Sequence, residues 1–122
     1  MIHLDTNFLI QALVAGSRVA AKLQTWLADG EDLSISAIAW SEFLCGPLTL
    51  KDVALAEMLF PEPEPFLASD ARKAAELFNA TGRRSRSLAD CQIAAVALRD
   101  ARVATGNVSD FALFQGQGLT LA

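Results

Sequence analysis

Apolar residues recur along this chain at two spacings, which predict short buried strands separated by helices. In two early segments they recur three or four residues apart, the spacing that places side chains on one face of a helix: Leu9, Ile10, Leu13 and Val14, then Val19, Leu23, Trp26 and Leu27. Elsewhere, short apolar runs end at polar or turn-forming residues, as buried strands do. We therefore expect helices over residues 7–15, 17–28, 37–45, 50–60, 69–80 and from 88, and strands over 2–4, 33–36, 66–67, 102–105 and 119–121.

The alternation of strands and helices predicts an α/β fold, a single three-layer α/β/α domain with a mainly parallel central sheet. The 122 residues are near the commonest domain size and contain no internal repeat, so one domain over residues 1–122 is expected. The proline-rich stretch 61–65 predicts an extended connector. In such sheets, functional sites gather beyond the carboxyl ends of the strands.

Composition narrows the class of protein. Hydrophobic residues make up 52% of the chain, which is typical of a globular protein. No apolar run approaches the ~18 to 20 residues that span a bilayer. The N-terminus lacks the basic region and long apolar stretch of a secretory signal. We therefore expect a soluble, cytoplasmic protein that binds no membrane.

The residue types exclude several kinds of active site. Cys45 and Cys91 are isolated, which argues against a zinc site or a disulfide framework, and both are expected to be small buried residues. His3 is the sole histidine and is expected to be an ordinary core or edge residue, which disfavours a Ser/His/Asp hydrolase. No phosphate-binding or nucleophile motif occurs. Carboxylates remain as the groups for chemistry.

Four of the fourteen acidic residues have unusual surroundings. Asp90 is the only charged residue between Leu88 and Leu98, in a run that is apolar nearly all round a helix and so belongs inside a domain. An acid there must be paired, metal-bound or protonated, because an isolated buried charge is very costly. Asp5 follows the mainly apolar residues 1–4 at the N-terminus. Glu42 lies in the middle of an expected helix, on a face that is not obviously exposed to solvent, and Asp110 lies in the loop expected after the strand 102–105.

The expected topology brings three of these acids together. Asp5 follows the first strand, Asp110 lies just past the strand 102–105, and Asp90 begins the helix that packs antiparallel to that strand. All three are therefore expected at the carboxyl edge of the sheet. Other acids fall in loops, at helix ends or beside basic residues, where solvent is expected to accommodate them: Asp29, Glu31, Asp32, Glu62, Glu64, Asp70, Glu76 and Asp100.

A structural role is the alternative for each of the four acids. Asp5, Asp90 and Asp110 each stand where a carboxylate caps a helix or turn. Ser87 would complete an S-x-x-D capping box with Asp90. Glu42 has the alternative of a lone surface glutamate. A purely structural role for all four acids at once is much less expected than for any single one.

Four motifs occur in order over essentially the whole chain: LDTNFLI, SAIAWSEFLCG, LADCQIAAVAL and ATGNVSDF. Together they resemble PIN-domain nucleases, and within that family the small ribonuclease toxins of bacterial toxin–antitoxin pairs, the VapC-like proteins. The resemblance implies an RNA substrate cut to 5′-phosphate and 3′-hydroxyl ends, a cognate antitoxin, a homodimer, and contact with DNA only through the antitoxin. It also implies an acidic cluster with polar neighbours: Asp5, Glu42, Asp90 and Asp110, with Thr6 or Thr105 and Asn107.

Physical chemistry favours a metal at such a cluster. Four clustered carboxylates would raise one another's pKa unless cations neutralise them. Oxygen ligands without His or Cys favour Mg²⁺ or Mn²⁺ over zinc. Such an ion activates water, and a pair about 3.5 to 4 Å apart would stabilise both the attacking and the leaving oxygen of a phosphodiester. We expect Asp5 and Asp90 to bind the metal directly, with Glu42 and Asp110 completing the shell directly or through water.

The net charge of −4 opposes nucleic-acid binding by the molecule as a whole. Arg83, Arg84 and Arg86 form a local basic loop suited to RNA phosphates, and a merely solvated loop is the alternative. The acidic site would also receive a basic antitoxin segment. Three aromatic residues either line a groove for that segment or pack in the core: Trp26, Trp40 and Phe60.

Two other functions stay open. A catalytically silent PIN-like binding module would keep the fold without the reaction, but all four acids are present. An Asp-based phosphotransfer domain would use Asp5 as the phosphorylated group. The sequence DTN lacks the second aspartate of the phosphatase pattern, and no lysine follows a late strand. We therefore rank both functions below that of a nuclease.

Overall fold

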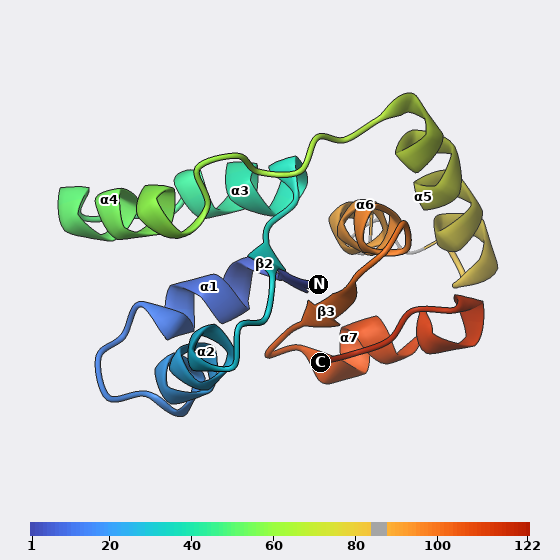
Figure 1. The fold of residues 1–122 in the computed structure, drawn as a ribbon. Helices are drawn as coiled ribbons and strands as arrows, with labels where there is room; N and C mark the ends of the chain where they lie inside the picture. Colours follow the sequence, from blue (N-terminus) through green and yellow to red (C-terminus); the bar gives the residue numbers. More distant parts are fainter. Residues whose placement is uncertain (84–87) are drawn as a thin grey trace.

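Three parallel strands form the centre of the molecule in the order β2-β1-β3, with helices on both sides (Figure 1). The computed structural model describes residues 1–83 and 88–122. Its elements are β1 (Ile2–Leu4), α1 (Thr6–Ala12), α2 (Arg18–Ala28), β2 (Leu33–Ser34), α3 (Ala37–Leu44), α4 (Leu50–Leu59), α5 (Ala68–Ala80), α6 (Leu88–Ala97), β3 (Arg102–Ala104), α7 (Val108–Ala112) and the 3-10 turn η2 (Gln115–Gln117). The predicted α/β architecture with a parallel central sheet is confirmed.

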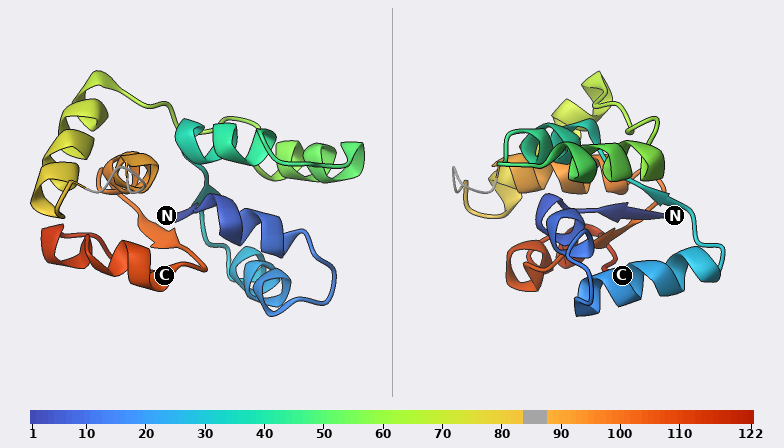
Figure 2. Two further views of the ribbon diagram at one scale, coloured as in Figure 1. Left: turned by 180° about the vertical axis from the view of Figure 1, so that it is seen from behind. Right: turned by 90° about the vertical axis from the view of Figure 1, so that its left-hand side faces the viewer.

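The two sides of the sheet carry different helices. α3, α5 and α6 lie on one side, and α2 and α7 lie on the other (Figure 2). α6 is apolar nearly all round and packs against both α3 and α5, and its residues 93–97 are all buried. This is the position that its sequence predicts. Among the helices of the two described ranges, none is long and apolar enough to cross a membrane.

Parallel pairing brings the carboxyl ends of the strands to one edge. β1 is the central strand, with Ile2 opposite Leu33 of β2. The amide of Asp5 donates to the carbonyl of Ala104 at 2.9 Å, so the pairing of β1 with β3 continues to the end of β3. Asp5 and Thr105 therefore leave the sheet side by side.

Two predicted strands differ from expectation. Residues 66–67 form no strand, and Glu64 instead makes a single parallel bridge to Ser36. The Glu64 amide donates to the carbonyl of Ile35 at 2.8 Å, and the prolines on either side of Glu64 have no amide with which to extend this bridge into a strand. Residues 119–121 contribute one bridge, between Leu121 and Val103.

The three aromatic residues considered for a partner groove pack against the core instead. Phe60 is only 3% exposed. Trp26 and Trp40 each stack on a core phenylalanine, with ring centroids 5.5 Å apart. Cys91 is buried as expected, but the expectation for Cys45 was wrong, because this residue ends α3 at the surface.

His3, in the middle of β1, is buried without a hydrogen-bond partner. The residue is 1% exposed, and neither ring nitrogen has a partner among the described residues. Desolvation lowers the pKa of the imidazole, and the negative charges of Glu64 and Asp100 oppose this effect. The expectation of a core residue is confirmed. Its unpartnered nitrogens reduce the stability of the fold.

We expect His3→Leu to be more stable than the wild type at pH 7 by about 1 to 3 kcal/mol, because it removes two buried polar atoms that lack partners. The difference should widen as the pH falls below the ordinary histidine value of 6.5, since the unfolded chain then binds a proton more readily than the folded protein. Urea denaturation at several pH values between about 5 and 7 measures both effects. A variant less stable throughout would mean that the imidazole makes a favourable contact.

Candidate active site

Asp5 is held at the carboxyl end of β1 by hydrogen bonds to both of its side-chain oxygens. The residue is 4% exposed. Oδ1 accepts from the backbone amide of Thr6 at 2.8 Å, and Oδ2 accepts from the Thr105 hydroxyl at 2.9 Å. The Thr105 oxygen in turn accepts from the amide of Asn107 at 2.9 Å. Asp5 is thus the N-cap of α1, as the capping alternative expected, and it is also tied to the loop after β3.

Glu42 on α3 reaches the same region through Thr6. The Thr6 hydroxyl donates to Glu42 Oε1 at 3.0 Å and to the carbonyl of Ala39 at 3.3 Å. Because the amide of Thr6 binds Asp5, this one residue contacts both carboxylates. The prediction that Glu42 is shielded from solvent was wrong. It is exposed, since the neighbouring Phe43 occupies the buried face of α3.

Asp90, in the first turn of α6, is partly buried and has a strongly perturbed acidity. Desolvation raises its pKa most, and three neighbouring carboxylates add to the shift, which reaches about 7: Asp5, Asp110 and Glu42. Ser87, the expected partner in a capping box, lies outside the described residues. Asp90 is therefore a partly desolvated acid that also feels the negative charge of three other carboxylates.

Asp5 has the same kind of environment. Desolvation raises its pKa most, and the hydrogen bonds from Thr105 and Thr6 oppose that shift. The charges of Glu42 and Asp110 raise the pKa of Asp5 as well. Carboxylates from separate elements thus act on Asp5 and Asp90 at the carboxyl edge of the sheet.

Asp110 lies in the first turn of α7 and not in a loop, contrary to the prediction. The amide of Asp110 donates to the carbonyl of Asn107 at 3.0 Å, and Asn107 is the N-cap residue of this helix. The fully buried Phe111 anchors the turn to the core. Asp110 is exposed, and the N-cap residue of α7 is Asn107 and not Asp110.

The donors of this cluster suit a hard cation. All are carboxylate oxygens, which Mg²⁺ and Mn²⁺ prefer. Desolvation raises the pKa of Asp5 and Asp90 most, and neighbouring carboxylates add to the shift; a bound cation would favour the charged form of both groups. Within residues 1–83 and 88–122, no three His, Cys, Asp or Glu side chains already converge as a ready-made metal site. The carboxylates would therefore have to draw closer around an ion.

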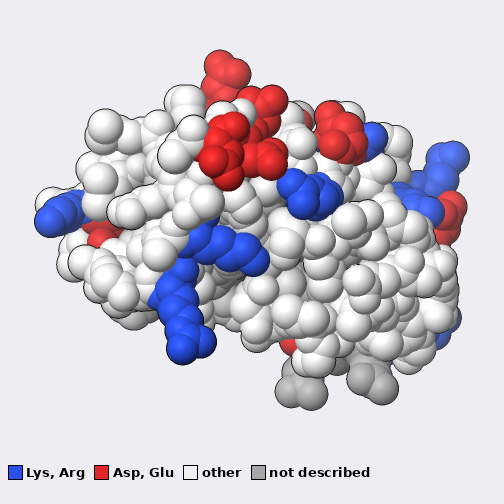
Figure 3. Space-filling model, turned by 60° about the horizontal axis from the view of Figure 1, so that its bottom comes forward, with Lys and Arg blue, Asp and Glu red and all other residues white. Residues whose placement is uncertain are grey.

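Of the three arginines predicted to bind RNA, Arg83 alone lies in the described part of the chain. It is exposed and follows Gly82, and the two residues have positive φ angles of 58° and 92°. Arg84 and Arg86 lie outside the described residues. One face of the molecule has scattered Lys and Arg side chains, with Asp and Glu gathered near its upper rim (Figure 3). Among the described residues drawn there, no continuous basic surface crosses this face.

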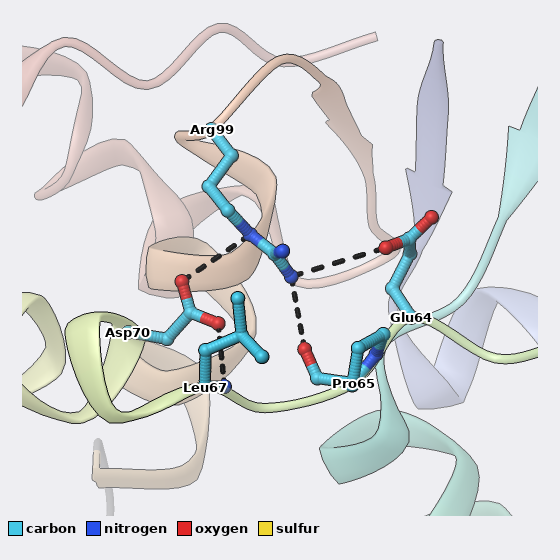
Figure 4. Close-up of polar contacts among 5 residues, drawn as sticks. All are labelled: Glu64, Pro65, Leu67, Asp70 and Arg99. Atoms are coloured by element: carbon cyan, nitrogen blue, oxygen red, sulfur yellow. Dashed lines mark hydrogen bonds and ion pairs between the residues drawn. The ribbon is translucent and has the colours of Figure 1, made fainter.

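Sequence analysis missed a second polar cluster, on the α5 and α6 side of the sheet. Asp70, expected in solvent, is 2% exposed. One of its oxygens lies 3.3 Å from Arg99 Nε, and the other accepts from the amide of Leu67 at 2.8 Å (Figure 4). The available signal was the place of Asp70 in the first turn of a helix, where an acid commonly binds an unpaired amide.

Comparisons with known proteins agree with this fold. Residues 2–106 match the model of the PIN domain. The chain belongs to the PIN domain family. Two solved relatives of this PIN domain are each 26% identical to it. FitAcB from Neisseria gonorrhoeae has a TM-score of 0.74 over 99% of this chain and 96% of that chain. A toxin–antitoxin complex from Klebsiella pneumoniae has a TM-score of 0.72 over 92% of this chain and 91% of that chain.

A third solved structure shares the fold at lower identity. VapBC2 from Rickettsia felis, solved with a DNA fragment from its promoter, is 21% identical, with a TM-score of 0.77 over 100% of this chain and 98% of that chain. No curated protein matches the sequence. The PIN domain match includes Asp5, Glu42 and Asp90, whereas Asp110 lies just beyond its end.

Proposed function

We propose that this PIN domain is a Mg²⁺- or Mn²⁺-dependent endoribonuclease. The observation that supports this most is the gathering of carboxylates at the carboxyl edge of the sheet. Asp5 and Glu42 share Thr6 as a hydrogen-bond donor, and the charges of Asp5, Glu42 and Asp110 act on the partly buried Asp90. A set of well-solvated helix caps would not raise the pKa of an aspartate to about 7. Asp5 and Asp90 would hold the ion, and the other two would complete its shell directly or through water. A bound cation would supply activated water and stabilise the charge that develops on the phosphodiester.

Two threonines orient the carboxylates before an ion binds. Thr6 contacts Asp5 through its amide and Glu42 through its hydroxyl. The Thr105 hydroxyl donates a hydrogen bond to Asp5. The amide of Asn107 donates to the Thr105 oxygen and so orients this hydroxyl toward Asp5. Such outer contacts orient metal ligands, and their loss commonly weakens metal binding or activity by about 10- to 100-fold.

We further propose that the protein is the toxin of a toxin–antitoxin pair. Support comes from the sequence motifs and from the similarity to the toxin–antitoxin complex from Klebsiella pneumoniae. An acidic site of this kind favours a basic antitoxin segment, which would exclude RNA from the carboxylates. We expect a homodimer, with contact to DNA only through the antitoxin.

RNA cleavage by the purified, antitoxin-free protein tests the nuclease proposal. We expect single-stranded or looped RNA to be cut in Mg²⁺ or Mn²⁺, leaving 5′-phosphate and 3′-hydroxyl ends, with no cleavage in EDTA. Undiminished cleavage in EDTA would rule out the metal mechanism. A protein that binds Mg²⁺ and RNA but cuts none of a broad set of RNAs would instead be a silent binding module.

The basic loop should contribute binding to RNA phosphates and no chemistry. Replacing Arg83, Arg84 and Arg86 with Ala should weaken RNA binding with little sequence preference. It should also flatten the log–log dependence of affinity on salt by ~0.7 for each lost phosphate contact. Fluorescence anisotropy at several salt concentrations measures both effects.

A matched variant removes the same charge from exposed positions elsewhere: Arg18, Lys51 and Arg72, each replaced with Ala. Its salt dependence should stay close to that of the wild type. Equal slopes in the loop variant and the wild type would mean that the loop is merely solvated.

A further inference from the structure

A polar cluster around Arg99 links the end of α6 to the segment between α4 and α5. Arg99 lies in the turn that follows α6. Its Nη2 donates to the carbonyl of Pro65 at 2.9 Å and lies 3.9 Å from Glu64 Oε2. Its Nε lies 3.3 Å from Asp70 Oδ1 (Figure 4). One guanidinium therefore contacts two residues of the connector and one residue in the first turn of α5.

The connector that Arg99 binds also fixes the beginning of α3. The Glu64 carbonyl accepts from the amide of Ala37, the first residue of α3, at 2.7 Å. The Glu64 amide binds the carbonyl of Ile35, and Ser36 between them caps the helix by accepting from the amide of Ala39 at 3.1 Å. The first amides of a helix lack partners within the helix, so the connector supplies one of them. A displaced connector would therefore displace the start of α3.

The contacts of Arg99 require the planar fork of an arginine. The Asp70 side chain is 3% exposed, whereas that of Arg99 is 33% exposed, so the buried carboxylate depends on this partner. The other oxygen of Asp70 accepts from the amide of Leu67, which holds the far end of the connector. A lysine would keep the positive charge but present a single ammonium group to acceptors that lie in different directions.

We infer that Arg99 is a positioning residue for the carboxylate cluster. By tying the end of α6 to the connector whose carbonyl binds the first amide of α3, it fixes how these two packed helices lie along each other. α6 carries Asp90 and α3 carries Glu42, so their relative placement sets the affinity of the cluster for a divalent cation. The inference rests on the proposed metal-dependent function and adds a residue that follows α6, at the opposite end of this helix from Asp90.

Mg²⁺ binding to Arg99→Lys tests this inference, measured by calorimetry and by the Mg²⁺ concentration that raises the melting temperature. We expect binding to weaken by a factor of about 2 to 30, the range of coupling through packed elements. Arg72→Lys, at an exposed position on α5, should bind Mg²⁺ like the wild type. In a Glu42→Gln background, the effect of Arg99→Lys should shrink, because the inferred route runs through the placement of Glu42.

Three results would overturn the inference. One is a melting temperature lowered equally in EDTA and in Mg²⁺ with Mg²⁺ affinity unchanged, which means a purely structural role. Another is an effect of full size in the Glu42→Gln background. A wild-type protein that binds no Mg²⁺ would overturn the proposed function as well as the inference. Failure of the inference alone leaves Mg²⁺ binding by the wild type intact. If Arg99→Lys folds poorly, the double variant Asp70→Asn/Arg99→Lys is used, because it removes the buried negative charge of Asp70. Its Mg²⁺ affinity is then compared with that of the single variant Asp70→Asn.

Discussion

Asp5→Asn and Asp90→Asn should each reduce RNA cleavage in Mg²⁺ by at least about 100-fold without unfolding the protein. The amide has nearly the shape of the carboxylate but lacks the negative charge that would attract a cation. At position 5 the amide oxygen can still accept a hydrogen bond, so α1 keeps a cap. Initial rates on a labelled RNA, together with circular dichroism, measure the loss and check the fold.

Asp29→Asn is the matched control for these variants. Asp29 is exposed at the end of α2, and its substitution changes the net charge by the same amount. This control should cleave RNA at the wild-type rate. Cleavage at the wild-type rate by Asp5→Asn or Asp90→Asn would remove that residue from the active site.

The sequence was most informative where hydrophobic pattern and topology act together. α6 is apolar nearly all round, which places it inside the domain and makes Asp90 conspicuous from the sequence alone. The alternation of strands and helices predicts a parallel sheet, and the carboxyl edge of such a sheet is where Asp5 and Thr105 meet. Periodicity and topology therefore yielded the architecture and the positions of Asp5 and Asp90.

Features that depend on contacts distant in the sequence were not predictable in this way. Asp70 lies in the first turn of a helix and close to Arg72 in the sequence, yet the guanidinium of Arg99, 29 positions later, covers it. Glu42 was expected to be shielded because its neighbours in the sequence are apolar, whereas the turn of α3 directs Phe43 inward and leaves Glu42 in solvent. Periodicity over eight residues does not settle which face of a short helix is buried.

In metal-free buffer, the acidic cluster should make the protein less stable as the pH rises. The pKa of Asp90 is about 7 in the folded protein against an ordinary value of 3.8, so the folded state binds more protons between these two values. The free energy of unfolding should therefore decrease as the pH rises through this window, and the raised pKa of Asp5 acts in the same direction. Asp90→Asn should remove much of this decrease.

The melting temperatures of the wild type and Asp90→Asn above pH 7, each in EDTA and in Mg²⁺, test most directly whether Asp90 belongs to a cation site. In EDTA the variant should melt at or above the wild type, and Mg²⁺ should raise the wild type more, because the ion binds the folded cluster. Ser17→Ala, which removes the cap of α2, shows the effect of a lost cap, about 0.5 to 2 kcal/mol with or without metal. If Asp90→Asn instead melts below the wild type by the same amount in both solutions, Asp90 is a helix cap and the cation site is contradicted.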